Sequence, residues 1–127
     1  MGYKETVTEP GQTQRMLIVD DDESLLSVVS LAFQKTGREV VSCSTFEEAR
    51  QRLREGHFDV LLTDVRLGAF NGIQLAVIGR DIHPGMQIIV FSGFDDPVLR
   101  QEAEHLGATY VVKPVSTASL LNILHWE

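Results

Sequence analysis

Hydrophobic residues along the chain follow two alternating kinds of spacing. Short, almost wholly apolar runs are typical of buried parallel strands, and apolar residues three or four positions apart mark one face of a helix. The runs predict strands at 16–19, 39–44, 58–63, 87–91 and 109–112. A helical pattern follows each run, so the sequence predicts five consecutive strand–helix units.

Capping signals mark where several of the helices begin. Thr45 and Glu48 predict a capping box at the start of the second helix. Asp96 followed by Pro97 predicts the start of the fourth, because proline is favoured at a first helical position. The fifth helix is expected over 116–126. In the first helix, the apolar spacing predicts a buried face made of Leu25, Val28, Val29, Ala32 and Phe33.

The strict alternation of strands and helices predicts a doubly wound α/β fold, in which helices cover both faces of a parallel sheet. Five strands in such a fold most often take the spatial order 2-1-3-4-5, as in flavodoxin-like proteins. That order places the three most apolar runs, the first, third and fourth, inside the sheet. Ligands of such folds bind beyond the carboxyl ends of the strands, at the switch point between the first and third.

Composition and charge narrow the possible functions. The 127 residues suffice for one domain, which we place at 15–127, behind a polar segment, 1–14, expected to be a flexible tail. No apolar run approaches the roughly 18 residues of a membrane span. The net charge of −7 argues against direct nucleic-acid binding by this chain, because phosphate backbones attract basic surfaces. A single cysteine, Cys43, excludes an internal disulfide and fits a reducing compartment, so we expect a cytoplasmic protein.

Chemically active side chains follow four of the five predicted strands. Asp20 and Asp21 come after the first strand, Asp64 after the third, Ser92 after the fourth and Lys113 after the fifth. Each alone has an ordinary explanation, such as a helix cap, a turn residue or a strand exit. Because the carboxyl ends of parallel strands share one edge of a sheet, these side chains are expected to meet there.

Such a cluster favours a divalent cation and phosphoryl chemistry. Carboxylates on neighbouring strands, about 4.8 Å apart, disfavour each other's ionisation, and a divalent cation relieves that repulsion. An all-oxygen donor set favours Mg²⁺, Mn²⁺ or Ca²⁺, and a sparse one left partly to water favours Mg²⁺. A carboxylate beside such an ion can act as a nucleophile toward phosphorus and form an aspartyl phosphate. Lys113 and Ser92 would then bind phosphoryl oxygens, by charge and by a hydrogen bond.

Four segments resemble response-regulator receiver domains of two-component signal transduction, in particular those like chemotaxis regulators. The first is MLIVDDDESLL, similar to the acidic opening of such domains, and the second is FDVLLTDVRLGAFNGIQL, similar to their phosphoacceptor segment. The third, IIVFSG, resembles the strand with the hydroxyl residue, and the fourth, GATYVVKPV, resembles the Lys-Pro segment with its aromatic residue. The resemblance runs from about residue 16 to the C-terminus and includes all five functional positions in order.

The resemblance implies that Asp64 is the phosphoacceptor. It implies that Asp21, Asp64 and the backbone carbonyl of Arg66 bind Mg²⁺ directly, while Asp20 acts largely through water. One departure follows the acceptor: Gly68 stands where the family usually has proline, which is expected to loosen this loop.

The remaining site residues are assigned by the same resemblance. Ser92 and Lys113 are expected to bind the phosphoryl group, and the Lys113–Pro114 bond is expected to be cis. Tyr110 would be the aromatic residue of the switch. After phosphorylation, Ser92 would move toward the phosphoryl oxygen and Tyr110 would turn inward, with its hydroxyl on backbone near Phe94.

The resemblance also implies the partners. The phosphoryl donor would be a histidine kinase or a phosphotransfer protein, and the recipient of the signal a downstream output domain or protein. The remodelled surface would comprise the fourth helix, fifth strand and fifth helix, with a homodimer as one possible outcome. No separate enzymatic activity is implied beyond self-catalysed phosphorylation and autodephosphorylation.

Three alternatives are weighed against this interpretation. A pseudo-receiver would keep the fold without phosphorylation, and the complete set of five site residues argues against it. A haloacid-dehalogenase-like phosphatase would carry an acid two residues after its nucleophile, where this chain has Arg66. A flavodoxin-like FMN protein would need a Ser-, Thr- and Gly-rich phosphate loop after the first strand, where Asp20 and Asp21 would repel a phosphate.

Overall fold

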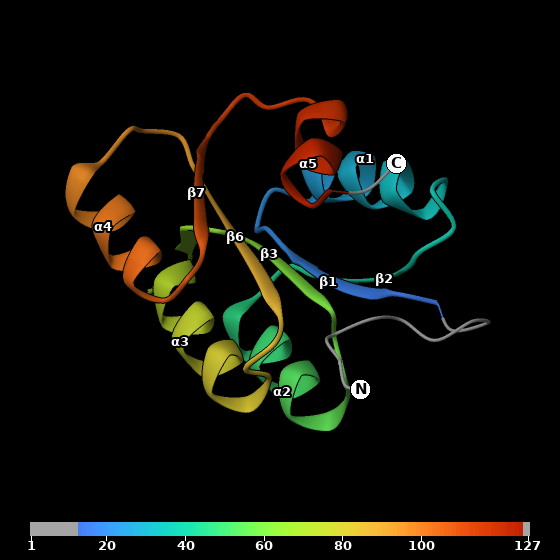
Figure 1. The fold of residues 1–127 in the computed structure, drawn as a ribbon, viewed down its shortest axis with the longest axis horizontal. Coiled ribbons are helices and arrows are strands. Elements are labelled where there is room, and N and C mark those ends of the chain that lie inside the picture. Colours follow the sequence, from blue (N-terminus) through green and yellow to red (C-terminus); the bar gives the residue numbers. More distant parts are fainter. Residues whose placement is uncertain (1–12, 126–127) are drawn as a thin grey trace, which may run out of the picture.

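The computed structural model describes residues 13–125, which form a five-stranded parallel sheet flanked by helices (Figure 1). The strand order β2-β1-β3-β6-β7 is the predicted order 2-1-3-4-5, because two short strands outside this sheet, β4 and β5, precede its fourth strand. Most of the expected tail, residues 1–12, lies outside the described residues, as does residue 126, the predicted end of the fifth helix. In the structure this helix is shorter than predicted, because it ends at Ile123 with Leu124 as its C-cap residue. The strands of the sheet are β1 (Arg15–Val19), β2 (Glu39–Cys43), β3 (Val60–Asp64), β6 (Gln87–Ser92) and β7 (Thr109–Val112).

Helices cover both faces of the sheet, as the alternation predicts (Figure 1). One face carries α1 (Glu23–Gln34) and α5 (Thr117–Ile123), whose buried residues share an apolar cluster with alternate residues of the strands. On the other face, α2 (Phe46–Glu55), α3 (Gly72–Ile82) and α4 (Pro97–His105) contribute to a second cluster. No helix among residues 13–125 is long and apolar enough to cross a membrane.

The helix starts follow the predicted capping chemistry. The side chain of Asp96 accepts hydrogen bonds from the backbone of the first turn of α4, with Pro97 at its first position. At the start of α2, Thr45 Oγ1 accepts from the Glu48 backbone N–H, which is only half of the predicted capping box, because the Glu48 side chain does not return a bond to the Thr45 backbone. A reciprocal capping box, however, was not anticipated at α3, where Asn71 is the N-cap residue.

The predicted buried face of α1 is wrong in part. The residues that the helix buries are Leu26, Ser30 and Phe33, whereas Val28 is 67% exposed. The spacing of 26, 30 and 33 defines a helical stripe just as well as the predicted one does. The two stripes overlap, and the way the helix lies on the sheet and against α5 selects between them.

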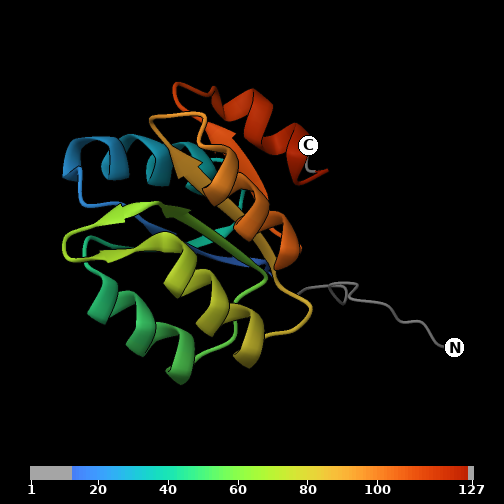
Figure 2. The ribbon, with the colours of Figure 1, turned by 90° about the vertical axis from the view of Figure 1, so that its left-hand side faces the viewer.

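A two-stranded hairpin, β4 (Arg66–Leu67) with β5 (Phe70–Asn71), stands where the sequence predicts a loop (Figure 2). Its turn has Gly68 at a φ of +65°, the conformation that two-residue hairpins favour at their first central position. Proline, with φ fixed near −65°, does not fit here. Phe70 stacks on Phe46 of α2, with the ring centroids 4.4 Å apart. The glycine therefore permits an ordered hairpin beside Asp64, the expected acceptor.

Candidate functional site

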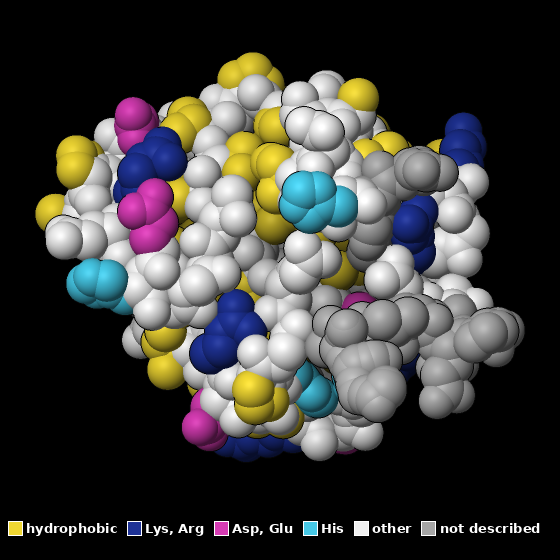
Figure 3. Space-filling model, in the orientation of Figure 1, with side chains coloured by type: hydrophobic (Ala, Val, Ile, Leu, Met, Phe, Trp, Pro, Cys, Tyr) yellow, Lys and Arg dark blue, Asp and Glu magenta, His cyan; other side chains and the backbone are white. Residues whose placement is uncertain are grey.

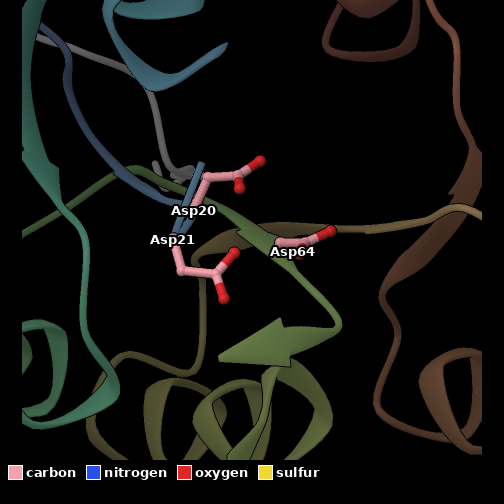
Figure 4. Close-up of side chains that lie close together, drawn as sticks. All are labelled: Asp20, Asp21 and Asp64. Carbon is pink, nitrogen blue, oxygen red and sulfur yellow. The ribbon is translucent and has the colours of Figure 1, made fainter. Parts of the chain in front are cut away.

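Three carboxylates meet at the carboxyl ends of two neighbouring strands (Figure 4). Asp20 and Asp21 follow β1, and Asp64 is the last residue of β3. Each offers one oxygen, and the three oxygens lie within 4.8 Å of one another. Asp20 and Asp64 are buried, whereas Asp21 is exposed, so the cluster opens to solvent on the Asp21 side. The parallel pairing of β1 with β3 is what brings together residues 43 or more positions apart in the chain.

Lys113 joins the two buried carboxylates. Its Nζ lies 3.1 Å from Asp20 Oδ2 and 3.0 Å from Asp64 Oδ1. The residue directly follows β7, and its backbone N–H donates to the Ser92 carbonyl at 2.7 Å, which continues the pairing of β6 with β7. The Lys113–Pro114 peptide bond is cis, as the resemblance implies.

The electrostatics of the cluster follow from burial and close charges. Burial raises the pKa of Asp64, the hydrogen bond from Lys113 opposes this rise, and the charges of Asp20 and Asp21 add to it. Burial lowers the pKa of Lys113, but its bonds to Asp64 and Asp20 outweigh burial, so this pKa is raised overall. Lys113 therefore stays protonated at neutral pH and offsets part of the repulsion among the carboxylates.

The acidic residues that follow β1 have two different roles: one caps a helix and another is bonded to Lys113. Asp22 is the N-cap residue of α1, and its Oδ1 accepts from the Leu25 backbone N–H at 3.1 Å. Asp20 instead turns toward Lys113 and accepts from the Asp22 backbone N–H at 2.9 Å. Helix capping therefore accounts for Asp22, whereas Asp20 is bonded within the carboxylate cluster.

The hydroxyl of Ser92 lies at the end of the next strand along, and the side chain is only 3% exposed. Its Oγ accepts a hydrogen bond from the Phe94 backbone N–H at 3.1 Å. Because a hydroxyl both accepts and donates, the Ser92 O–H proton remains able to form a further hydrogen bond.

Tyr110 and Arg66 both contact Phe94, in the loop that follows β6. Tyr110 is buried, and its hydroxyl donates to the Phe94 carbonyl at 2.9 Å. The Tyr110 ring thus already lies in the inward position that is expected after phosphorylation, held there by the hydrogen bond to Phe94. The Arg66 guanidinium lies 5.2 Å from the centroid of the Phe94 ring. The role of the Arg66 carbonyl as a metal ligand stays a prediction.

Gly72 lies in close contact with Asp64, which the sequence analysis did not predict. A Cβ at this residue would lie 2.1 Å from the backbone oxygen of Asp64 and 3.0 Å from Thr63 Oγ1. Its N–H donates to the Val65 carbonyl at 2.7 Å, so the start of α3 is held directly against the end of β3. The only signal in the sequence is a glycine at the first position of a helix, where nothing about helix formation requires one.

Together these groups suit transfer of an anionic group to Asp64. A carboxylate oxygen is placed beside an ammonium group, with a hydroxyl donor on the neighbouring strand and two further carboxylates able to ligate a hard cation. The donor set contains only oxygens, which fits Mg²⁺, Mn²⁺ or Ca²⁺ better than zinc or copper.

Comparison with known proteins supports the same interpretation. The sequence profile of the response regulator receiver domain matches residues 16–125. The response regulator receiver protein CpdR of Brucella abortus is 29% identical over 110 residues, which cover 86% of this chain and 92% of that protein. The alginate biosynthesis transcriptional regulatory protein AlgB of Pseudomonas aeruginosa is 29% identical over 107 residues, which cover 84% of this chain. The match spans only 24% of AlgB, so the chain corresponds to about a quarter of that longer regulator.

Solved structures agree in fold. A CheY-like receiver domain protein from Methanospirillum hungatei superposes with a TM-score of 0.85 at 28% identity, covering 90% of this chain and 92% of that one. A response regulator from Burkholderia pseudomallei, solved with a phosphorylated aspartic acid, a calcium ion and citrate, gives a TM-score of 0.81 at 25% identity. That match covers 85% of this chain and 64% of the other. With the profile match, the parallel fold and the acidic cluster in agreement, this chain belongs to the response-regulator receiver-domain family of two-component signalling.

Proposed function

We propose that this receiver domain accepts a phosphoryl group on Asp64 from a histidine kinase or phosphotransfer protein, in a reaction that depends on Mg²⁺. The observation that carries the proposal is the position of Lys113 Nζ, 3.0 Å from Asp64 Oδ1, at the edge of the three-carboxylate cluster. A structural lysine could neutralise one buried acid. Lys113 does more than this, because it is shared between Asp20 and Asp64, and an ammonium in that position can also pair with the oxygens of a phosphoryl group on Asp64.

The transfer needs few groups from the protein. An Asp64 carboxylate oxygen attacks phosphorus, a bond forms between them, and the bond from phosphorus to the donor's histidine nitrogen breaks. The ammonium of Lys113 then pairs with a phosphoryl oxygen, and the Ser92 hydroxyl donates to another. Burial strengthens both interactions, because they form in a site with less water to screen them.

The residues that would hold Mg²⁺ are Asp20, Asp21 and Asp64, with the carbonyl of Arg66. Bound there, the ion would neutralise charge on the carboxylates and the phosphoryl oxygens. Asp21, as the exposed member, would supply its carboxylate without breaking the Lys113 bridge. The Burkholderia pseudomallei relative was solved with a calcium ion, which supports the binding of a divalent cation by such a domain.

The output surface in this proposal comprises α4, β7 and α5, next to Ser92 and Tyr110. A partner or output domain would bind there, or a second copy of the chain. The beryllofluoride-activated NtrC4 receiver domain, similar to this chain with a TM-score of 0.79 at 29% identity, is described as a dimer.

Acetyl phosphate labelling tests the acceptor. The wild-type chain, Asp64→Asn and Asp81→Asn are incubated with acetyl phosphate and Mg²⁺, and phosphoryl incorporation is measured by intact mass. Asp81 lies on the exposed side of α3 and serves as a matched acid control. We expect labelling of the wild type and of Asp81→Asn and none of Asp64→Asn, because its amide is a poor nucleophile. Equal labelling of Asp64→Asn would disprove the assignment, and an unlabelled wild type would favour the pseudo-receiver.

A further inference from the structure

The loop between β6 and α4 is tied to β7 by Tyr110. The phenol ring is 5% exposed, and its hydroxyl donates to the Phe94 carbonyl at 2.9 Å. A buried tyrosine needs a partner for its hydroxyl, and this carbonyl supplies one only while the ring points inward. The inward ring and the position of the loop therefore depend on each other.

Arg100, on α4, contacts both the ring and the loop. Its guanidinium carbon lies 4.9 Å from the centroid of the Tyr110 ring, within the range of a cation–π interaction. Its Nη2 lies 2.8 Å and its Nε 3.2 Å from the same oxygen of Asp95, the residue after Phe94. One arginine thus joins the helix, the loop and the switch residue. Figure 3 shows basic and acidic side chains side by side on the α4 side of this face.

These contacts favour one position of Tyr110 over the other. The guanidinium can lie over the ring face only while the ring is inward beneath it, so the interaction adds to the stability of that state alone. A cation–π contact at an exposed site contributes enough to change such an equilibrium about two- to fivefold. The ion pair with Asp95 fixes the orientation of the Arg100 guanidinium over the Tyr110 ring.

A second arginine contacts the same loop from the acceptor side. Arg66 follows Asp64 by two positions and lies 5.2 Å from the centroid of the Phe94 ring. The loop is therefore held from β4 as well as from α4, while its own carbonyl holds Tyr110. None of these contacts involves a carboxylate of the phosphorylation site.

We propose that Arg100 is a positioning residue that holds Tyr110 inward, so that the arrangement associated with signalling is already populated without phosphorylation of Asp64. The link to signalling rests on the proposed function, but the effect of Arg100 on the ring does not. Phosphorylation would then act on an equilibrium that already favours inward Tyr110. It would therefore produce a smaller change at α4 and β7 than it would if Arg100 did not hold the ring inward.

The test measures the rotamer of Tyr110 in the whole chain, without any phosphodonor. Three-bond couplings give the χ1 populations of Tyr110 by NMR, in the wild type, Arg100→Met, Arg100→Lys and Gln101→Met. Methionine keeps an unbranched side chain and helix propensity but lacks the cation. Gln101 is an exposed neighbour on α4 and controls for changes to the helix itself.

We expect the ratio of inward to outward Tyr110 to fall about two- to fivefold in Arg100→Met, to be partly restored in Arg100→Lys, and to be unchanged in Gln101→Met. A ratio in Arg100→Met equal to that of the wild type would overturn the proposal, as would an equal fall in Gln101→Met. Because no phosphodonor is present, either result is independent of whether Asp64 is labelled by acetyl phosphate. The NMR populations therefore test the role of Arg100, and the labelling experiment tests the proposed function, each without the other.

Discussion

Replacement of Gly72 by alanine should disturb both the fold and the acceptor residue. The new Cβ would lie 2.1 Å from the Asp64 backbone oxygen, about 1.3 Å short of the 3.4 Å at which ordinary contact begins. The obstructing atom is backbone rather than a flexible side chain, so relief requires that α3 or the end of β3 shift. The hydrogen bond from the Gly72 N–H to the Val65 carbonyl, 2.7 Å long, would lengthen with it.

The magnitude follows from two contributions. Overpacking against a fixed group destabilises by about 1–3 kcal/mol. A weakened backbone hydrogen bond adds about 1 kcal/mol. We therefore expect Gly72→Ala to lower the free energy of unfolding by about 2–4 kcal/mol, which for a domain of this length is roughly 4–14 °C in melting temperature.

Thermal and urea denaturation of Gly72→Ala and Gly93→Ala, each followed by circular dichroism, provide the measurement. A Cβ at Gly93 meets nothing within 4 Å, so the control should stay within about 0.5 kcal/mol of the wild type. Phosphoryl incorporation from acetyl phosphate should also slow in Gly72→Ala, because Asp64 moves relative to Lys113. If Gly72→Ala proved as stable as Gly93→Ala, the close approach of α3 to Asp64 would be refuted.

Three further predictions concern other parts of the molecule. Mg²⁺ at ten times its dissociation constant should stabilise the fold by about 1.4 kcal/mol, or roughly 3–5 °C, in a thermal scan at fixed ionic strength. An equal shift in Asp21→Ala would contradict the assigned site. Ser30 Oγ is buried and has no hydrogen-bond partner within residues 13–125, so Ser30→Ala should raise the free energy of unfolding by about 1 kcal/mol in urea titrations. A loss of stability there would show that the hydroxyl is needed. Burial raises the pKa of the Cys43 thiol to about 11 from its ordinary 9.0, so the folded chain keeps a proton that the unfolded chain loses. Stability should therefore fall as the pH rises from about 9 to 11, and fall less steeply in Cys43→Ala, as measured by denaturation at each pH. Identical slopes for the two proteins would be evidence against the buried thiol.

The amino-acid sequence by itself determined the topology and the membership of the site. Five apolar runs separated by helical patterns allow few arrangements, because crossovers between parallel strands are right-handed and ligands meet the carboxyl ends. Asp20, Asp21, Asp64 and Lys113 could therefore be placed together from the sequence, and the structure brings the three carboxylates within 4.8 Å of one another with Lys113 bonded to two of them. Placing them required only the strand order and the residue that follows each strand.

The tertiary structure alone decided which atoms meet. Periodicity selected the wrong stripe of α1, because the predicted stripe is wholly apolar while the stripe that docks on the sheet includes Ser30. Nor did it show that Lys113 bridges two acids, that Gly72 lies against the acceptor carbonyl, or that Arg100 covers Tyr110. The physical reason is common to all four. A pattern along the chain specifies which face of an element is apolar, whereas contacts within hydrogen-bond distance depend on how elements distant in sequence pack and on the rotamers that this packing permits.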